Sequence, residues 1–595
     1  MKIVRNVGLS LFLIGFFLFN ATFFLNHYQL APAHIARFVS NSEKADLLNK
    51  ELTSLFESNI SSNFDFVSRL DDTFTHINQS QLTKYSIGED EIDEIVKANS
   101  ADSIKFSSSS LSEVFANESE TNSYKIKSLQ DYGSWMDGRD YGSEEELRGH
   151  ITNVVNNINK YGIISQKGFD RYEIKDLKYN LTKAASIGPV ANHPILFIFL
   201  TFGLCMVGAL MFILPKIKEL LGIKNNGMFH DPMKTAKWLG ILTGTYLILF
   251  YIVLYYFPQY MTSWVIMVDP ISRFIKGSEA GPFFLYGLIY TLCILVMGVR
   301  MLIKYRHSKY QVIRTFSVMF FQIAFAFLIP EILLRLNQPY FDFKNIWPLN
   351  YSFFFDNNIN SLLQSGGLGV FMLGWGIVLV VVAVPVFVYF FGKRWYCSWV
   401  CGCGGLAETL GDPYRQLSDK SLKAWKVERW MIHSVLLFAV VMTAGVLYTY
   451  FTGTSEVLGV STYKIRETYG AWIGAGFAGV VGTGFYPLMG NRVWCRFGCP
   501  LAAYLGFVQR FKSRFRITTN GGQCISCGNC STYCEMGIDV RWYAQRGQNI
   551  VRSSCVGCGV CSSVCPRGVL NLENRDEESR FVEPISIGDG GLKLR

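Results

Sequence analysis

The chain has 595 residues, half of them hydrophobic and 17% charged, and its formal net charge is +10. Its apolar residues gather in stretches of about 20 with almost no charge, which is the length that a helix needs to cross a bilayer. This distribution excludes a purely soluble protein. We expect the lipid bilayer as its environment and no nucleic acid among its partners.

Eight stretches are long and apolar enough to cross a membrane as helices. They are residues 7–26, 193–214, 237–257, 281–302, 315–335, 367–391, 430–451 and 470–489. Lys and Arg are concentrated in the connections after the second, fourth and sixth stretch, as expected of loops that stay inside the cell. We therefore predict a polytopic α-helical membrane protein of about eight spans, with both chain ends in the cytoplasm.

The first stretch, within residues 1–27, is predicted to be an N-terminal membrane anchor. A signal peptide is the alternative, because the start is basic and Ala31-Pro32-Ala33 follows. The apolar run is longer than that of a usual signal peptide, and the small residues lie several positions beyond it. Both observations favour the anchor.

Residues 28–192 form a long polar segment with 25 acidic and 17 basic residues and no cysteine. The absence of thiols from this segment fits an oxidising compartment. We predict a small extracytoplasmic domain, helical or α+β, that contacts a partner. Its sequence contains no recognisable catalytic constellation.

Residues 193–365 are predicted to contain spans two to five, and residues 366–515 a membrane core with two matching cysteine elements. The elements read GKRWYCSWVC (392–401) and GNRVWCRFGCP (490–500), and both contain Gly-x-Arg, an aromatic residue and Cys-x3-Cys. Each follows a span that runs inward, so two cysteine pairs reach the same membrane face. The thiols are Cys397 and Cys401, Cys495 and Cys499, with Cys403 as a fifth nearby.

Three interpretations of these pairs stay open. The four cysteines could hold an iron–sulfur cluster that bridges the spans, form a redox-active thiol pair or a disulfide, or simply pack at the interface. Repetition of the pattern on one side argues against packing, and the lack of a C-x-x-C spacing argues against a thioredoxin-like role. We favour the cluster, with Cys403 as a spare thiol or an alternative ligand.

Residues 516–575 carry two copies of C-x2-C-x2-C-x3-C, the spacing of bacterial two-cluster ferredoxins. In such proteins the fourth cysteine of each copy ligates the other cluster. The first 4Fe–4S set is then Cys524, Cys527, Cys530 and Cys565, and the second is Cys555, Cys558, Cys561 and Cys534. We predict an α+β ferredoxin domain here, followed by a tail at 576–595. One departure is that Glu535, and not proline, follows Cys534.

The combination of paired Cys-x3-Cys elements at span ends with a two-cluster ferredoxin segment resembles the NosR/NapH-type membrane polyferredoxins, with CcoG-type proteins as cousins. The resemblance covers about residues 366–575. It implies electron transfer between the quinone pool or a cytoplasmic donor and a periplasmic redox protein, in the bacterial inner membrane, with residues 28–192 periplasmic. NosR-like members also carry FMN attached through a threonine, but no such attachment sequence is recognisable in 28–192. The first element also differs, reading Cys401-Gly402-Cys403 where the family has Cys-Pro.

We therefore expect a membrane-bound iron–sulfur electron-transfer protein, a quinol dehydrogenase-like oxidoreductase component. The alternative is an assembly or redox-sensing factor that reduces metals or thiols for a partner enzyme. Iron–sulfur clusters at one face cannot carry electrons across a ~30 Å hydrocarbon layer by themselves, so a carrier within the membrane is needed, either a quinone or an unrecognised cofactor. His433, near the inner end of a predicted span, and His193, at the outer end of another, are candidates for a quinone or haem site. Glu331, inside the fifth predicted span, is a candidate for a proton or quinone site.

Overall fold

The computed structural model describes residues 1–100, 104–117, 119–218, 233, 235–574, 587–588 and 591–592. The chain divides into two compact units. Unit 1 comprises Met1–Asn20, Ile195–Phe257 and Met267–Arg595, and unit 2 comprises Ala21–Pro194 and Pro258–Ile266. The predicted tail at 576–595 lies outside the described residues, apart from the short strands β7 (Ile587–Gly588) and β8 (Gly591–Leu592).

Unit 2 is almost entirely helical. Its helices are α2 (Pro32–Phe38), α3 (Ser42–Glu51), α4 (Thr53–Phe56), α5 (Asn63–Tyr85), α6 (Glu89–Ala98), α7 (Leu111–Val114), α8 (Glu120–Gly133), α9 (Glu144–Asn157), α10 (Ile163–Gln166), α11 (Arg171–Ala185) and α12 (Pro189–Asn192). Side chains such as Asn41 and Asp170 accept the first backbone amides of α3 and α11, which defines where these helices begin. The strands β1 (His27–Tyr28) and β2 (Ser186–Ile187) form an antiparallel pair that brings the two ends of the unit together.

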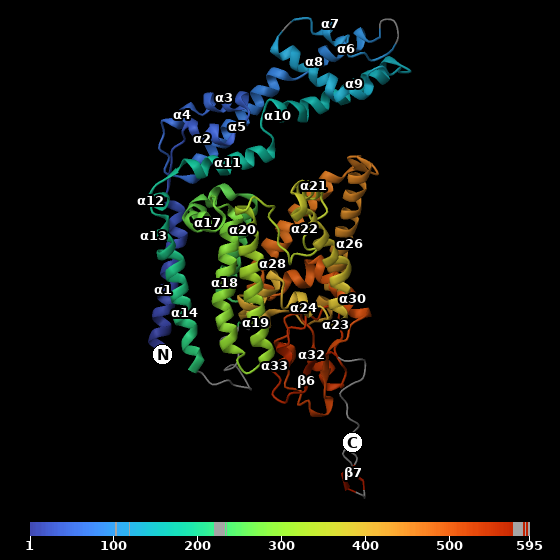
Figure 1. The fold of residues 1–595 in the computed structure, drawn as a ribbon. Coiled ribbons are helices and arrows are strands. Elements are labelled where there is room, and N and C mark those ends of the chain that lie inside the picture. Colours follow the sequence, from blue (N-terminus) through green and yellow to red (C-terminus); the bar gives the residue numbers. More distant parts are fainter. Residues whose placement is uncertain are drawn as a thin grey trace. The chain divides into compact units, whose positions relative to one another are not determined.

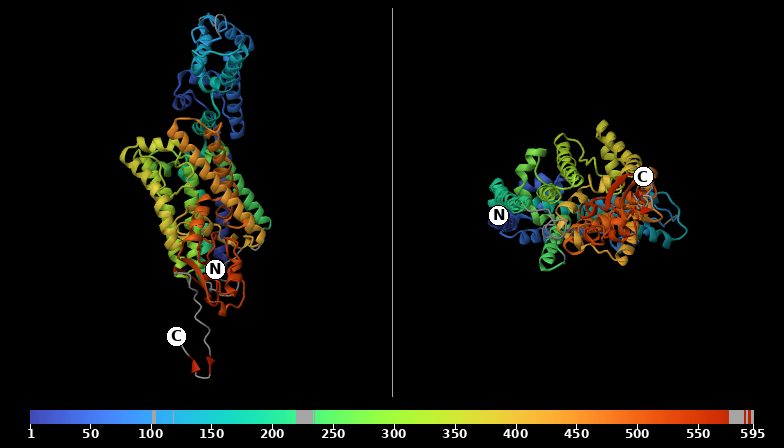
Figure 2. Two further views of the ribbon diagram at one scale, coloured as in Figure 1. Left: turned by 90° about the vertical axis from the view of Figure 1, so that its right-hand side faces the viewer. Right: turned by 90° about the horizontal axis from the view of Figure 1, so that it is seen from below.

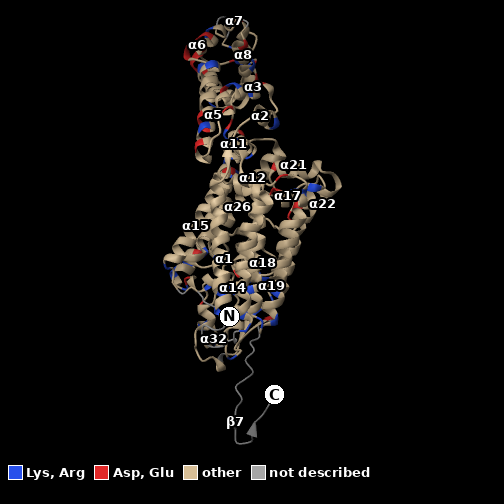
Figure 3. Ribbon diagram, turned by 90° about the vertical axis from the view of Figure 1, so that its left-hand side faces the viewer, with Lys and Arg blue, Asp and Glu red and all other residues tan. Residues whose placement is uncertain are grey.

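In the part of the chain that the structure describes, seven helices, most of them in unit 1, are long and apolar enough to cross a membrane, which confirms the predicted polytopic α-helical class. They are Lys2–Phe24, Pro194–Lys218, Trp238–Tyr256, Pro282–Lys304, Lys309–Arg335, Gly366–Phe391 and Leu422–Thr452. In Figure 3 the long helices of unit 1 are almost free of charged residues along their length. The eighth predicted span, 470–489, is helical but is interrupted once, at Phe485, and the number of spans stays a prediction.

The same spans are assembled from helices that run side by side in unit 1 (Figures 1 and 2). Several contain a π-helical turn, so that one span carries two labels. The helices of the seven spans are α1 (Lys2–Ala21), α13 (Pro194–Ile198), α14 (Leu204–Ile213), α15 (Trp238–Tyr256), α18 (Pro282–Lys304), α19 (Lys309–Phe321), α20 (Ile329–Arg335), α22 (Gly366–Val378), α23 (Val384–Phe391) and α26 (Leu422–Thr452). Further helices outside these spans are α16 (Thr262–Met267, all but its last residue in unit 2), α17 (Asp269–Lys276), α21 (Asp356–Gln364), α27 (Thr462–Tyr469), α28 (Gly482–Gly484) and α29 (Tyr486–Met489). The hairpin β3 (Glu456–Val457) and β4 (Val460–Ser461) follows α26.

Helices α1 and α14 approach each other through glycines. A Cβ atom on Gly208 would lie 2.4 Å from the amide nitrogen of Phe12, and one on Gly8 would lie 2.7 Å from the carbonyl oxygen of Gly208. Only glycine allows backbones to come so close, a common way to pack helices inside a membrane.

The elements that carry the clustered cysteines, and those beside them in the same part of the chain, gather at one end of unit 1 (Figure 1). They are α24 (Arg394–Cys397), α25 (Gly402–Thr409), α30 (Pro500–Phe511), α31 (Asn529–Thr532), α32 (Val540–Gln545) and α33 (Val560–Ser563), with strands β5 (Phe515–Thr519) and β6 (Leu570–Asn574). The two strands pair antiparallel from Phe515↔Asn574 to Thr519↔Leu570, which closes the ferredoxin segment on itself. One hydrophobic core joins this segment to α23 and α30, so the ferredoxin part packs directly on the helical bundle.

Candidate metal centres

Four thiols surround a first cavity, which we call site 1, with about 360 Å³ of empty volume. They are Cys524, Cys527, Cys530 and Cys565. Gly528, with φ of 79°, precedes α31 and turns the chain so that Cys530 faces the same cavity as the cysteines before it. Cys527 is exposed, which makes site 1 accessible from the surface.

The second cysteine set surrounds a cavity of about 380 Å³, which we call site 2. Its members are Cys534, Cys555, Cys558 and Cys561. Gly559, with φ of 73°, precedes α33 as Gly528 precedes α31, so the two copies of the motif fold alike. Cys555 and Cys561 are buried, and site 2 is therefore less accessible than site 1.

The paired Cys-x3-Cys elements converge on a third cavity of about 270 Å³, which we call site 3. It is lined by Cys397, Cys401, Cys403, Cys495 and Cys499. Cys401 and Cys499 are the N-caps of α25 and α30, and Cys499 accepts a hydrogen bond from the amide of Ala502. The four cysteines of the two pairs are at most 8% exposed, so site 3 is the most deeply buried of the three.

The fifth thiol of site 3 affects its neighbour. A hydrogen bond with Cys403 lowers the pKa of Cys401 to about 6, against the opposing effect of burial. Cys403 is therefore close enough to act on a predicted ligand, whether or not it is one.

The three cavities fit a cofactor bound by thiolates. All 15 cysteines lie in the described part of the chain, and all are free thiols. Burial raises the pKa of Cys530 to about 12 and that of Cys555 to about 11, so these thiols keep their protons at neutral pH unless a metal displaces them. Four soft sulfur donors around one small cavity are the ligand set of an iron–sulfur cluster.

Buried charges around sites 2 and 3 also fit such a group. The five cations Arg300, Lys304, Arg314, Arg415 and Arg492 pair with the three carboxylates Glu408, Asp412 and Glu535, and all eight side chains are at most 9% exposed. Burial opposes ionisation of Glu408, but the three guanidinium groups around it hold its pKa well below its usual range. The network therefore keeps an excess of positive charge, which is costly in a buried place unless negative charge lies nearby. Metal-bound thiolates supply negative charge.

Sequence reasoning missed these charged residues. The signal that could have found one is the Gly-x-Arg shared by the two cysteine elements. In the second element Arg492 is buried and its Nη1 lies 3.6 Å from the Sγ of Cys495. In the first element Arg394 donates instead to Asn574 and stacks on Phe515, so one sequence pattern has two different environments.

Two of the candidates for a quinone or proton site differ. His433 lines a small cavity that also reaches Cys495, Lys393 and Glu428. Glu331 is buried, and its Oε2 has no hydrogen-bond partner in the part of the chain that the structure describes. His433 thus shares a cavity with the predicted ligand Cys495.

Two family models match this end of the chain. A 4Fe-4S binding domain matches residues 373–421 and 470–518, which contain the two Cys-x3-Cys elements. A 4Fe-4S dicluster domain matches residues 523–570, which contain both ferredoxin motifs. Both matches concern iron–sulfur proteins, in agreement with the chemistry of the three cavities. No solved structure matches the chain significantly.

Curated relatives each match between about a quarter and a third of this chain. The putative electron transport protein YccM of Escherichia coli is 28% identical over 25% of this chain and 43% of its own length. Protein NirI of Paracoccus denitrificans is 27% identical over 30% of this chain and 26% of its own length. The methylamine utilization ferredoxin-type protein MauN of Methylobacillus flagellatus is 27% identical over 26% of this chain and 52% of its own length. The chain thus spans between about a quarter and half of the length of these relatives.

Proposed function

We infer that this chain is a membrane polyferredoxin that moves electrons between the quinone pool or a cytoplasmic donor and a periplasmic redox partner. The observation that carries the proposal is the convergence of three cysteine sets on three cavities at one end of the helical bundle. The membrane is the bacterial inner membrane, with this end in the cytoplasm, as the Lys and Arg distribution favours.

We assign one 4Fe–4S cluster to site 1, one to site 2 and a third to site 3. The third assignment is supported by the family match over both Cys-x3-Cys elements and by the burial of their thiols around one cavity. Such a cluster exchanges one electron at a time and no proton. The protein's own part is to hold the thiolates, to exclude water and to place charges around them.

Exposure gives the order of the three sites in a relay. Site 1 contains the exposed Cys527, site 2 is partly buried and site 3 is buried. A soluble partner can approach site 1, whereas site 3 lies next to the spans. We therefore place the contact with a cytoplasmic protein at site 1 and the contact with the membrane carrier at site 3.

The cavity beside His433 is the place where a quinol headgroup would meet site 3. Its walls include the apolar side chains of Ile432, Ala502 and Ala503, and Cys495 reaches the same cavity. Oxidation of a quinol releases two electrons and two protons. Because clusters take only electrons, the protons need an acceptor among the lining residues, and His433 is the imidazole available for that role.

Iron counting with EPR spectroscopy tests the proposal. The parent should contain about 12 iron atoms per chain, four for each cluster. Cys397→Ser and Cys495→Ser should each lose about four, together with one and the same EPR signal, whereas Cys293→Ser, a lone thiol of α18, should lose none. Cys397→Ser and Cys495→Ser chains with full iron and every parental signal would refute a cluster at site 3.

Addition of a quinol analogue to membranes that contain the parent chain or its variants tests the direction of electron transfer. Cluster absorbance should bleach as electrons arrive, and His433→Phe, which has no proton acceptor, should slow the bleaching without loss of iron. If no bleaching occurs with any quinol and iron is complete, the donor is not the quinone pool.

One observation favours the alternative function in assembly or sensing. Site 3 contains five thiols, one more than a cluster needs. A spare thiol suits a factor that reduces metals or thiols for another enzyme. In that case the Cys403→Ser chain should keep all of its clusters. In a bacterial strain that makes only this variant, the partner enzyme should lose its metal.

A further inference from the structure

Two buried arginines each contact a sulfur of a different site. Arg415 Nη1 lies 3.9 Å from the Sγ of Cys558 in site 2, and Arg492 Nη1 lies 3.6 Å from the Sγ of Cys495 in site 3. Both side chains are 0% exposed. Each arginine therefore presents its charge directly to a predicted cluster ligand.

Two carboxylates join these arginines to each other. Glu535 lies 2.8 Å from Arg415 and 3.1 Å from Arg492. Glu408 lies 2.5 Å from Arg415 and 2.6 Å from Arg492. These four side chains, which we call the Arg–Glu bridge, form an unbroken polar connection between one sulfur of site 2 and one of site 3.

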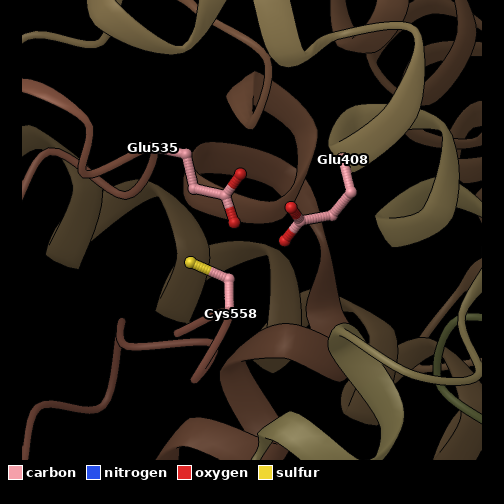
Figure 4. Close-up of side chains that lie close together, drawn as sticks. All are labelled: Glu408, Glu535 and Cys558. Carbon is pink, nitrogen blue, oxygen red and sulfur yellow. The ribbon is translucent and has the colours of Figure 1, made fainter. Parts of the chain in front are cut away.

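The bridge accounts for the departure in the first ferredoxin motif. Pro566 follows Cys565, but Glu535 follows Cys534. Figure 4 shows the carboxylates of Glu535 and Glu408 pointing toward each other, with the sulfur of Cys558 close by. A proline in place of Glu535 would remove one of the two carboxylates that join the arginines.

A metal ion held by Glu408, Glu535 and Cys558 is one alternative, since their ligand atoms lie within 4.8 Å of one another. Both carboxylates already pair with arginines, and Cys558 belongs to the cysteine set of site 2, so an added cation would meet like charge. A network that only holds the ferredoxin segment in place is the second alternative. Such a network would not need a contact with a sulfur at each end.

We propose that the Arg–Glu bridge couples sites 2 and 3 electrostatically and sets their reduction potentials together. The proposal rests on the clusters of the proposed function. With a cluster bound at each site, an electron that passed between them would oxidise one cluster as it reduced the other, and no bond would form or break. Positive charge and hydrogen bonds at ligand sulfurs stabilise the reduced form and raise the potential. Because the bridge is buried, its charges are weakly screened and act on both sites.

Redox titration of the full-length chain, followed by EPR, tests the coupling. Glu535→Gln keeps the side-chain shape and removes a negative charge, so the potentials of sites 2 and 3 should both rise while that of site 1 stays the same. Arg492→Gln should lower both potentials, and Arg492→Lys, which retains the charge, should restore most of the parental values. Arg300→Gln is the matched control, because Arg300 is a buried cation that pairs with Asp412. Its effect on both potentials should be smaller than that of Arg492→Gln.

The coupling is overturned if Glu535→Gln shifts neither potential or only that of site 2, or if Arg300→Gln shifts both as much as Arg492→Gln does. Should Arg492→Gln fail to retain iron, the isosteric Glu535→Gln decides the question alone. A parent chain without clusters at sites 2 and 3 would refute the proposed function instead. Iron content and potentials thus separate the two failures.

Discussion

The ion pair between Arg496 and Glu428 holds a cysteine element to a membrane helix, and its loss should be costly. Arg496 follows Cys495, and Glu428 lies near the start of α26. Their charged atoms are 2.7 Å apart, and the side chains are 3% and 6% exposed. Arg496→Met leaves Glu428 buried without its cation. We expect a loss of about 3–5 kcal/mol in the free energy of unfolding, typical of a broken buried pair.

Removal of both charges should restore most of that stability. A buried ion pair replaced by apolar residues of similar size is often neutral or stabilising by about 1–4 kcal/mol. The double variant Arg496→Met/Glu428→Leu should therefore be at least about 3 kcal/mol more stable than Arg496→Met alone. The hydrogen bond from Arg496 to the carbonyl of Asp419 does not enter this difference, because both variants lose it.

Unfolding in mixed micelles with a rising fraction of SDS measures these differences. Arg466→Met is the matched control, because Arg466 pairs with Asp356 where the side chains are 21% and 47% exposed. A pair so exposed should contribute less than about 1 kcal/mol. A double variant as unstable as Arg496→Met, or a control that costs as much, would refute the reasoning.

Two further predictions concern other parts of the chain. Gly208→Leu places side-chain atoms where α1 passes and should cost about 1–3 kcal/mol in the same micelle assay, whereas Gly203→Leu, whose Cβ would lie 3.7 Å from its nearest neighbour, should cost less. In unit 2, hydrogen bonds from Tyr85 and Lys84 lower the pKa of Glu120 to about 2 from 4.5. The ionised carboxylate stabilises the fold above pH 4.5, and this contribution is lost as the pH falls toward 2. Cleavage of the full chain by pepsin should therefore accelerate between pH 4.5 and 2. The acceleration should be smaller in Glu120→Gln, which has no carboxylate to protonate at this position.

Local spacing was enough to predict the elements of the ferredoxin segment. Three cysteines separated by two residues, with a glycine free to adopt positive φ, can face one cavity without help from distant parts of the chain. Apolar length likewise predicts membrane helices, because the bilayer thickness sets it. The helix at 470–489 shows the limit of that rule: composition predicts one uninterrupted span, but the helix is interrupted at Phe485.

The meeting of the two Cys-x3-Cys elements was only a hypothesis from their repeated pattern, since nothing local brings residues 98 positions apart into one cavity. The environments of the buried charged residues were even harder to predict from the sequence. Arg394 and Arg492 occupy the same position of the same pattern, yet one lies beside Asn574 and the other beside Cys495.

The sequence by itself therefore determined what depends on near neighbours: the membrane class, the cysteine spacing and the presence of a glutamate where the repeat has proline. The tertiary structure alone decided which buried charges surround which sulfur. Electrostatic interactions of buried groups depend on distances between segments far apart in the chain, and folding sets those distances.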